Sequence, residues 1–450
     1  MQHEPDDETS RLHQSVLRSL AACVPGGAPL IVGYSGGRDS AVLLDALATL
    51  GPPLGHAVSA VHVHHGLSAN AGHWAQFCVK RCAQLGVACM VRRVDVPQAP
   101  STSLEAEARH VRYDALAQAA RELGASVVVV ALAHHRNDQA ETLLLQLLRG
   151  AGPHGLAAMP TLREDAAGNL WWRPLLDLPR TAIDAYARGR GLAWIDDESN
   201  ADHRHARNAV RNVVFPALTT VARQAETTLA RAAAHQAEAA RLLDELAAQD
   251  AVGAYAQGTL QRDALDALSA HRARNLLRWF LRSNGLPAPS TARLAAMLDQ
   301  LRDARGDAQI RLRHAGVEIG VHQGRIALHP PEPLRFDVPW SGEPELSLAH
   351  GTLVFAHVDG AGIDEQRLAG IDVRIRSREG GERFQLTPDR PRRALKAILR
   401  DAGIPAWERH GLPLVWCGDA LAAVAGVGID AAFRAAPAQP GVTIAWHPKA

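Results

Sequence analysis

The order of apolar and amphipathic segments between residues 29 and 135 constrains the fold most strongly. Short apolar runs such as PLIVGYS and SVVVVALAHH alternate with segments of helical periodicity such as DSAVLLDALATL and HWAQFCVKRCAQLG. Strands that alternate with helices form a parallel sheet with helices on both faces, and such sheets bind ligands beyond the carboxyl ends of their strands. The sequence therefore predicts an α/β domain whose site residues follow the strands.

The character of the sequence changes after Pro216, and we predict three domains. The following segment is rich in alanine, with leucines at helical spacing, and indicates a long helix. Short strands follow from about residue 309, and the last segment mixes strands and helices. The predicted domains are a catalytic α/β domain at 1–217, a helical middle domain at 218–333 and a small α+β domain at 334–450.

Composition excludes several classes of protein. Apolar residues make up 47% of the chain and charged residues 21%, which is ordinary for a globular protein. No apolar run approaches membrane-spanning length, and the start MQHEPDDETS has no signal-peptide core. The five cysteines form no CxxC pair and no metal-ligand spacing. We therefore expect a cytoplasmic protein with no membrane partner, and the oligomeric state is open, a homodimer included.

The first candidate site is the stretch SGGRDS, which follows an apolar run. Gly36 and Gly37 permit a tight turn, and the helix that follows offers free N–H groups to an anion. Ser35 and Ser40 can donate hydrogen bonds, while Asp39 could cap the helix or help to hold a phosphate-bound Mg²⁺. The alternative is a strand-to-helix turn with a Ser/Asp cap. The predicted ATP-binding residues are Ser35, Gly36, Gly37, Arg38, Asp39 and Ser40.

The second candidate site is the stretch AHHRNDQAET. If a helix begins near Asn137, Asp138 and Glu141 share one face of it, at the ligand edge of the sheet. Two carboxylates there suit a cationic substrate, and we expect both to lie near the surface. The alternative is that acids occupy a first helical turn because the helix dipole favours them there.

Two groups of histidines follow predicted strands, His134 with His135, and His62 with His64 and His65. A magnesium-nucleotide enzyme needs no histidine ligand, so we expect no dedicated transition-metal site. Packing or hydrogen bonding near a nucleotide is the expected role.

Several motifs, in this order and spacing, resemble those of the tRNA(Ile)-lysidine synthase family within the N-type ATP pyrophosphatase, or PP-loop, superfamily. They are YSGGRDSAVLL, HVHHGLSANA, EARHVRYDAL, AHHRNDQAETLLLQLLRGAGPHGLAAMP, WWRPLLDLPR and WIDDESNADHRHARNAVRNVVFP. The carboxyl-terminal stretch from RIRSREGG to GVGID is similar to the terminal domain of that family. The resemblance implies a PP-loop catalytic domain, a helical middle domain and a terminal α+β domain that binds tRNA.

The resemblance also implies the reaction. ATP adenylates the C2 oxygen of a cytidine at the first anticodon position of an isoleucine tRNA, and the amine of L-lysine then displaces AMP to form lysidine. Enzymes of the superfamily split ATP between the α and β phosphates. Their loop therefore grips the departing pyrophosphate, and no P-loop lysine is needed. ATP and Mg²⁺ are the implied cofactors.

Site residues follow from the same resemblance. Asp138 and Glu141 would recognise or orient lysine, and Arg112 and Arg211 could neutralise developing phosphate charge. A solvated ion pair is the alternative for Arg112. Further candidates are His134, Asn200 and Arg207. The sequence does not indicate which group accepts the proton of the lysine amine.

The stretch from Arg374 to Arg409 is locally basic, with ten arginine and lysine residues against five acids. We expect Arg392, Lys396 and Arg400 to share one helical face, where they could follow phosphates. A solvated helix face is the alternative. The predicted tRNA-binding residues are Arg390, Arg392, Arg393, Lys396 and Arg400.

Three other functions compete with this interpretation. A tRNA thiolase would need paired nucleophilic cysteines or an iron–sulfur site, and Cys78 and Cys82 lie within one helix-like stretch. An amidotransferase-linked synthetase would need a glutamine-hydrolysing domain, and none is apparent. A binding module without activity could keep the fold, but the intact SGGRDS and DQAET motifs argue against the loss of catalysis.

Overall fold

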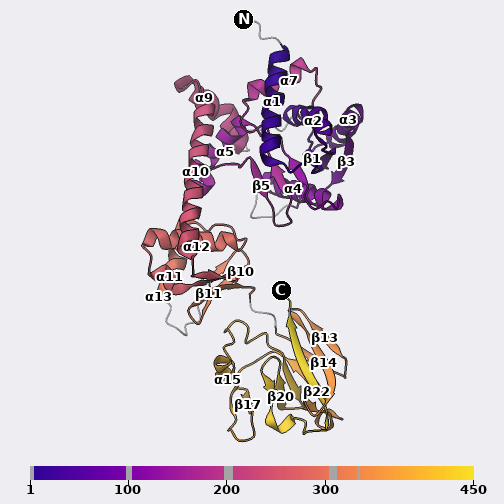
Figure 1. Cartoon of the computed structure of the whole chain (residues 1–450), viewed down its shortest axis with the longest axis vertical. Coiled ribbons are helices and arrows are strands. Elements are labelled where there is room, and N and C mark those ends of the chain that lie inside the picture. Colours follow the sequence, from indigo (N-terminus) through magenta and orange to yellow (C-terminus); the bar gives the residue numbers. More distant parts are fainter. Residues whose placement is uncertain (1–4, 98–103, 197–205, 304–311, 332–334, 450) are drawn as a thin grey trace. The chain divides into compact units, whose positions relative to one another are not determined.

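A computed structural model describes residues 5–97, 104–196, 206–303, 312–331 and 335–449 (Figure 1). The chain divides into two compact units, Met1–Leu242 and Leu243–Ala450. The three domain boundaries expected from the sequence stay a prediction. Within the described residues, no helix combines the length and apolar character needed to cross a membrane.

The first unit is built on a six-stranded sheet with the order β3-β2-β1-β4-β6-β5. Its strands are β1 (Leu30–Gly33), β2 (Val58–His64), β3 (Ala88–Arg93), β4 (Val129–Ala131), β5 (Leu162–Glu164) and β6 (Leu170–Trp172). All neighbours are parallel except β5, which runs antiparallel to β6 at the edge. Because β1 and β4 are parallel neighbours, the loops after them start side by side. The predicted α/β fold with a mostly parallel sheet is confirmed.

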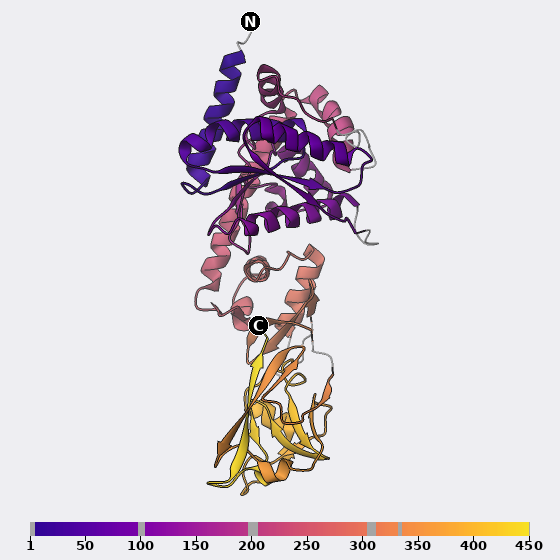
Figure 2. The same ribbon diagram turned by 90° about the vertical axis from the view of Figure 1, so that its right-hand side faces the viewer.

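Helices cover both faces of this sheet, as Figure 2 shows. Leu30 and Val32 of β1 are buried in one apolar cluster, whereas Ile31 between them belongs to another, as expected when successive side chains point to opposite faces. The first cluster contains residues of α1 (Pro5–Cys23), α2 (Arg38–Leu50), α3 (Ala71–Gln84) and α7 (Arg180–Gly189), and the second contains residues of α4 (Leu104–Glu122).

The segment after β4 forms α5 (Arg136–Leu148) and α6 (Pro153–Leu156). Later in the chain, α8 (Ala206–Ala209), a π-helical turn (Val210–Val214) and α9 (Phe215–Val221) follow one another. Val210 and Phe215 are buried against Ala140 of α5, so α5 and the π-helical turn lie side by side. The expected alanine-rich helix is α10 (Ala225–Ala251).

The second unit contains two parts with separate apolar cores. One part has α11 (Arg262–Asp266), α12 (Ala270–Ser283) and α13 (Thr291–Asp303) beside a sheet of β7 (Tyr255–Ala256), β8 (Thr259–Gln261), β9 (Leu312–His314), β10 (Val317–His322) and β11 (Arg325–His329). The helical middle of the chain is thus confirmed.

The other part is rich in strands, as expected for a mixed terminal domain. One sheet has β12 (Asp337–Pro339), β16 (Val373–Arg376), β19 (Leu414–Cys417), β20 (Ala420–Val424) and β21 (Gly428–Ile429). A second sheet has β13 (Glu345–Leu348), β14 (Gly351–Asp359), β15 (Ile363–Asp364) and β22 (Pro440–Pro448). The short elements β17 (Arg383–Phe384), β18 (Arg393–Ala394), α14 (Glu365–Leu368) and α15 (Leu395–Asp401) complete it.

Candidate active site

The SGGRDS stretch forms the turn between β1 and α2. Gly36 has φ of +89°, and a Cβ there would lie 2.7 Å from the Cδ1 of Ile195 and 3.0 Å from the Sγ of Cys78. The hydroxyl groups of Ser35 and Ser40 are 3.1 Å apart, and Ser40 also donates to the carbonyl of Gly37 at 2.9 Å. The turn is therefore preformed, with the amino end of α2 behind it.

The two charged residues of the turn differ in their surroundings. Arg38 forms ion pairs with Asp184 of α7 and with its neighbour Asp39. The Oδ2 of Asp39 lies 3.6 Å from the Nε2 of His135. Burial raises the pKa of Asp39, but the hydrogen bond to His135 and the charges of His135 and Arg38 together outweigh burial and leave that pKa below its usual value. Asp39 is therefore an ionised carboxylate at the edge of the turn.

His135 links the two candidate sites, although His134 is the histidine predicted from the sequence. His135 is buried and follows β4, and its Nε2 is 3.6 Å from both the Oδ2 of Asp39 and the Oδ2 of Asp138. Burial lowers its pKa, but the two carboxylates outweigh burial and raise it. His134 is instead a half-buried neutral imidazole, because desolvation lowers its pKa to about 3.

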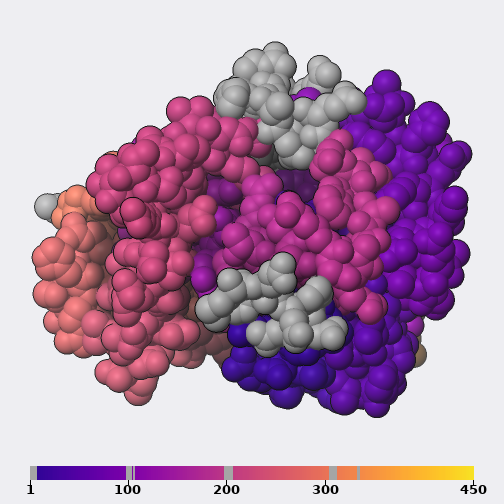
Figure 3. Space-filling model, turned by 90° about the horizontal axis from the view of Figure 1, so that it is seen from above, coloured from indigo at the N-terminus to yellow at the C-terminus, as the bar shows by residue number. Residues whose placement is uncertain are grey.

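Asp138 and Glu141 lie on one face of α5, as predicted, but the expectation that they lie near the surface is wrong. They are only 7% and 2% exposed, because α8 and the π-helical turn pack against α5. Figure 3 shows the chain from above, with pink atoms of the α9 and α10 region beside magenta atoms of the first unit.

Two arginines of the packing segment hold both carboxylates. Arg207 donates from Nε to Glu141 and from Nη2 to Asp138, both at 2.9 Å. Arg211 donates from Nε to Glu141 at 2.6 Å, and from Nη2 to Glu141 at 2.9 Å and to Asp138 at 3.2 Å. Burial raises the pKa of Asp138, but His135 and Arg207 outweigh burial and lower it to about 2. Both acids are therefore paired with cations of the chain itself.

Arg112 and the histidines of β2 lie at the neighbouring strand end. The Nε of Arg112, on α4, is 3.4 Å from the Nε2 of His65. Burial and the charge of Arg112 lower the pKa of His65 to about 4. The Nδ1 of His62 is 3.0 Å from the carbonyl oxygen of Tyr34, a hydrogen-bonding role of the kind we expected. Asn200 lies outside the described residues.

The basic residues of the second unit share one helical face only in part. Lys396 and Arg400 are exposed and four residues apart in α15, so they share a face. Arg392 precedes this helix, and its Nη2 is 3.0 Å from the Oδ1 of the fully buried Asp430. The expectation that Arg392 shares the face is therefore wrong. Arg393 pairs with Asp401 at 2.6 Å, and Arg390 is exposed.

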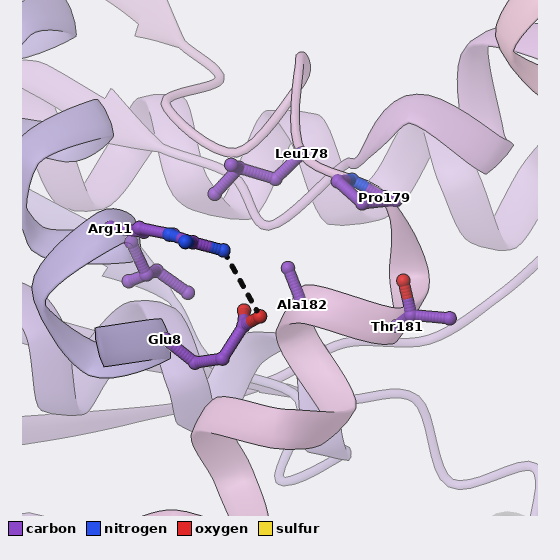
Figure 4. A pocket seen from close by; sticks show the side chains of 7 residues that line it. Glu8, Arg11, Leu178, Pro179, Thr181 and Ala182 are labelled. Atoms are coloured by element: carbon purple, nitrogen blue, oxygen red, sulfur yellow. Dashed lines mark ion pairs between the residues drawn. The ribbon is translucent and has the colours of Figure 1, made fainter. Parts of the chain in front are cut away.

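A hollow of about 300 Å³ lies between α1 and the start of α7 (Figure 4). An ion pair between Glu8 and Arg11, 3.6 Å apart, forms part of its wall. Its other lining residues are Leu12, Leu178, Pro179, Thr181 and Ala182, so it contains none of the predicted site residues.

Comparison with known proteins identifies the family of the chain. Three family models match the chain, a PP-loop domain at residues 9–218, a TilS substrate binding domain at 260–327 and a TilS substrate C-terminal domain at 373–446. The tRNA(Ile)-lysidine synthase of Nitrosomonas europaea is 43% identical over 438 residues, which cover 96% of this chain and 94% of the relative. The chain belongs to the tRNA(Ile)-lysidine synthase family. That of Ralstonia nicotianae is 41% identical and covers 97% of each chain.

The family membership confirms the function and enzyme class predicted from the sequence, an ATP-dependent ligase that modifies tRNA. Among solved structures, the chain is similar to the U34-tRNA thiolase NcsA of Methanococcus maripaludis, at 14% identity and a TM-score of 0.46 over 52% of this chain and 80% of that one.

Proposed function

We propose that this chain forms lysidine in two steps at the edge of the six-stranded sheet. ATP adenylates the C2 oxygen of the cytidine at the first anticodon position of an isoleucine tRNA, and pyrophosphate leaves. The amine of L-lysine then displaces AMP. The observation that carries this proposal is the link through His135 between a phosphate-binding turn and a pair of carboxylates, since His135 lies 3.6 Å from Asp39 and from Asp138.

In this proposal, the turn from Ser35 to Ser40 receives the pyrophosphate. The positive φ of Gly36 and the free N–H groups at the start of α2 suit an anion. The side chain of Asp39 is ionised and 36% exposed, which fits a Mg²⁺ ion bound to the phosphates of ATP. Such an ion neutralises phosphate charge and takes its other ligands from water and substrate.

Lysine is assigned to Asp138 and Glu141. Two carboxylates on one helix face suit an ammonium group, which must lose a proton before it can attack. Arg112, Arg207 and Arg211 are the candidates for neutralising phosphate charge. His134 and Asn200 keep a weaker assignment to the same site.

The exposed cations around α15 are assigned to the tRNA, which they would hold by its phosphates while the anticodon base is read in the first unit. Lys396 and Arg400 carry this assignment best, because Arg392 also has a structural partner in Asp430. A cytoplasmic location follows from a tRNA substrate.

Incubation of the chain with radiolabelled L-lysine, ATP and total tRNA tests the function. Label should enter the tRNA, and α- and γ-labelled ATP should yield AMP and pyrophosphate. ADP with inorganic phosphate, or transfer of sulfur without transfer of lysine, would reject the proposal.

A further inference from the structure

Every carboxylate oxygen of Asp138 and Glu141 already has a partner inside the chain. The Oδ1 of Asp138 accepts from Arg207 and Arg211 at 2.9 and 3.2 Å, and its Oδ2 accepts from the backbone N–H of His135 at 2.9 Å. The Oε1 of Glu141 accepts from Arg211, and its Oε2 accepts from both arginines. An incoming ammonium group would therefore find cations of its own charge on the oxygens that should bind it.

The arginines form the more exposed layer of this cluster. The side chains of Arg207 and Arg211 are 22% and 28% exposed, whereas those of Asp138 and Glu141 are 10% and 3% exposed. Solvent, and any ligand that arrives from it, meets the guanidinium groups before it meets the carboxylates.

The cluster also lies next to the phosphate-binding turn. Asp39 of the turn contacts His135, which contacts Asp138. The charge of Asp39 contributes, after those of Glu141 and Asp138, to raising the pKa of Arg211. Arg211 belongs to the π-helical turn Val210–Val214, and π-helical turns are rare and often occur at functional sites. A nucleotide phosphate in the turn would offer both arginines an alternative anion.

We propose that Arg207 and Arg211 are an internal lock that occupies the lysine site until a bound nucleotide draws them onto its phosphates. The inference rests on the assignment of lysine to Asp138 and Glu141. The four side chains carry no net charge as a group, and in the exchange each of them gains a new partner of opposite charge. Each arginine passes from a carboxylate to a phosphate, and the carboxylates pass from the arginines to the ammonium. No covalent bond changes in this step.

Two measurable consequences follow. A lock lowers the apparent affinity for lysine in proportion to the fraction of molecules in which it is open, so nucleotide should tighten lysine binding, and lysine should tighten nucleotide binding by the same factor. Removal of one arginine should tighten lysine binding without nucleotide and reduce the effect of nucleotide. If the two arginines only hold the carboxylates in position, removal of one arginine should instead weaken lysine binding, because the site would be disturbed.

Calorimetric titration of L-lysine into the full chain, with and without the Mg²⁺ complex of α,β-methylene-ATP, tests the lock. For the unmodified chain we expect nucleotide to lower the lysine Kd by about 5-fold or more, within the range usual for coupled sites. Arg211→Gln and Arg207→Gln should each lower the nucleotide-free lysine Kd by several-fold. Arg231→Gln, at an exposed position on α10, is the matched control and should change neither value.

The outcomes separate the lock from the lysine assignment. Asp138→Asn and Glu141→Gln should weaken lysine binding strongly, and unchanged binding in both would reject the assignment of lysine and the lock with it. If these variants lose lysine while Arg211→Gln and Arg207→Gln bind it as the unmodified chain does, or more weakly, only the lock is rejected. Arg211→Lys is a second variant for the case that Arg211→Gln fails to fold. An ammonium lacks the fork of donors that holds two carboxylates, so Arg211→Lys should also gain affinity for lysine, by less than Arg211→Gln. The absence of any gain in lysine affinity would reject the lock.

Discussion

Gly36→Ala tests whether the phosphate-binding turn is held in one conformation by packing. The residue has φ of +89°, and an added Cβ would lie 2.7 Å from Ile195 and 3.0 Å from Cys78. A left-handed conformation costs a residue with a Cβ about 1–2 kcal/mol, and overpacking costs about 1–3 kcal/mol. The reduced entropy of the unfolded chain returns about 0.4–1 kcal/mol. We therefore expect the free energy of unfolding to fall by about 1–5 kcal/mol.

The assay is thermal unfolding of the full chain, followed at the transition that ATP shifts to higher temperature, because a ligand stabilises the unit that binds it. A loss of roughly 3 kcal/mol lowers the Tm of a domain of this size by about 6–12 °C. Gly37→Ala is the matched control, since φ is −71° there and the nearest atom to an added Cβ is 3.4 Å away. Its Tm without ATP should stay close to that of the unmodified chain.

Two results would refute this reasoning. One is a Gly36→Ala chain that unfolds at the unmodified temperature, which would mean that the turn relaxes at no cost. The other is an equal loss in Gly36→Ala and Gly37→Ala, which would mean that the backbone angle and the contacts with Ile195 and Cys78 do not decide the outcome.

Further predictions concern the charged residues. Arg392→Ala should cost about 1–3 kcal/mol of stability in a denaturation experiment, because the buried Asp430 loses a charged partner. Lys396→Ala should leave the Tm unchanged and lower the magnitude of the salt slope of tRNA binding by about 0.7–0.9, which titrations at several salt concentrations would measure. The pKa of His134 is about 3 in the folded chain, against 6.5 for an unperturbed histidine, so the stability that the neutral ring contributes is complete above pH 6.5 and falls below it. The free energy of unfolding should fall by about 2 kcal/mol between pH 7 and pH 5, and denaturation of His134→Gln at the two pH values should lack this fall. Asp39→Ala should suppress formation of AMP and pyrophosphate from ATP, as thin-layer chromatography would show.

Features that depend on near neighbours in the chain could be predicted from the sequence. The alternation of strands and helices, the turn at SGGRDS and the start of a helix near Asn137 all follow from local periodicity and turn chemistry, and the structure begins α5 at Arg136. The long alanine-rich helix is confirmed for the same reason, although it begins at Ala225.

Features that depend on distant partners could not be predicted. Asp138 and Glu141 meet Arg207 and Arg211, which lie 66 to 73 residues further along the chain, and nothing in the acidic motif indicates this packing. The choice between His134 and His135 depends on which side of a strand end faces the neighbouring turn. The sheet determines which of the two histidines faces the turn, and the identity of the two residues does not.

The prediction for Arg392 is wrong because its position also depends on distant partners. Spacing of four residues suggested one helix through Arg392, Lys396 and Arg400, but Arg393 and Ala394 instead pair as β18 with β17. Pro391 immediately precedes Arg392 and argues against a helix that continues from upstream. The pairing of β18 with β17 and the ion pair with the buried Asp430 together determine the position of Arg392.

The neutral cluster of two acids and two arginines has a consequence for the order of substrate entry. Buried charges are tolerated when they are paired, and removal of one partner costs several kcal/mol because the other charge stays buried. A lysine ammonium that entered alone would leave Arg207 and Arg211 without their carboxylates, and those arginines would oppose its binding. A phosphate that entered alone would draw the arginines away from Asp138 and Glu141. Entry of an anion and a cation together leaves each arginine beside a phosphate and both carboxylates beside the ammonium, so the cluster favours lysine in the presence of nucleotide. A lysine affinity that is independent of nucleotide would contradict this order.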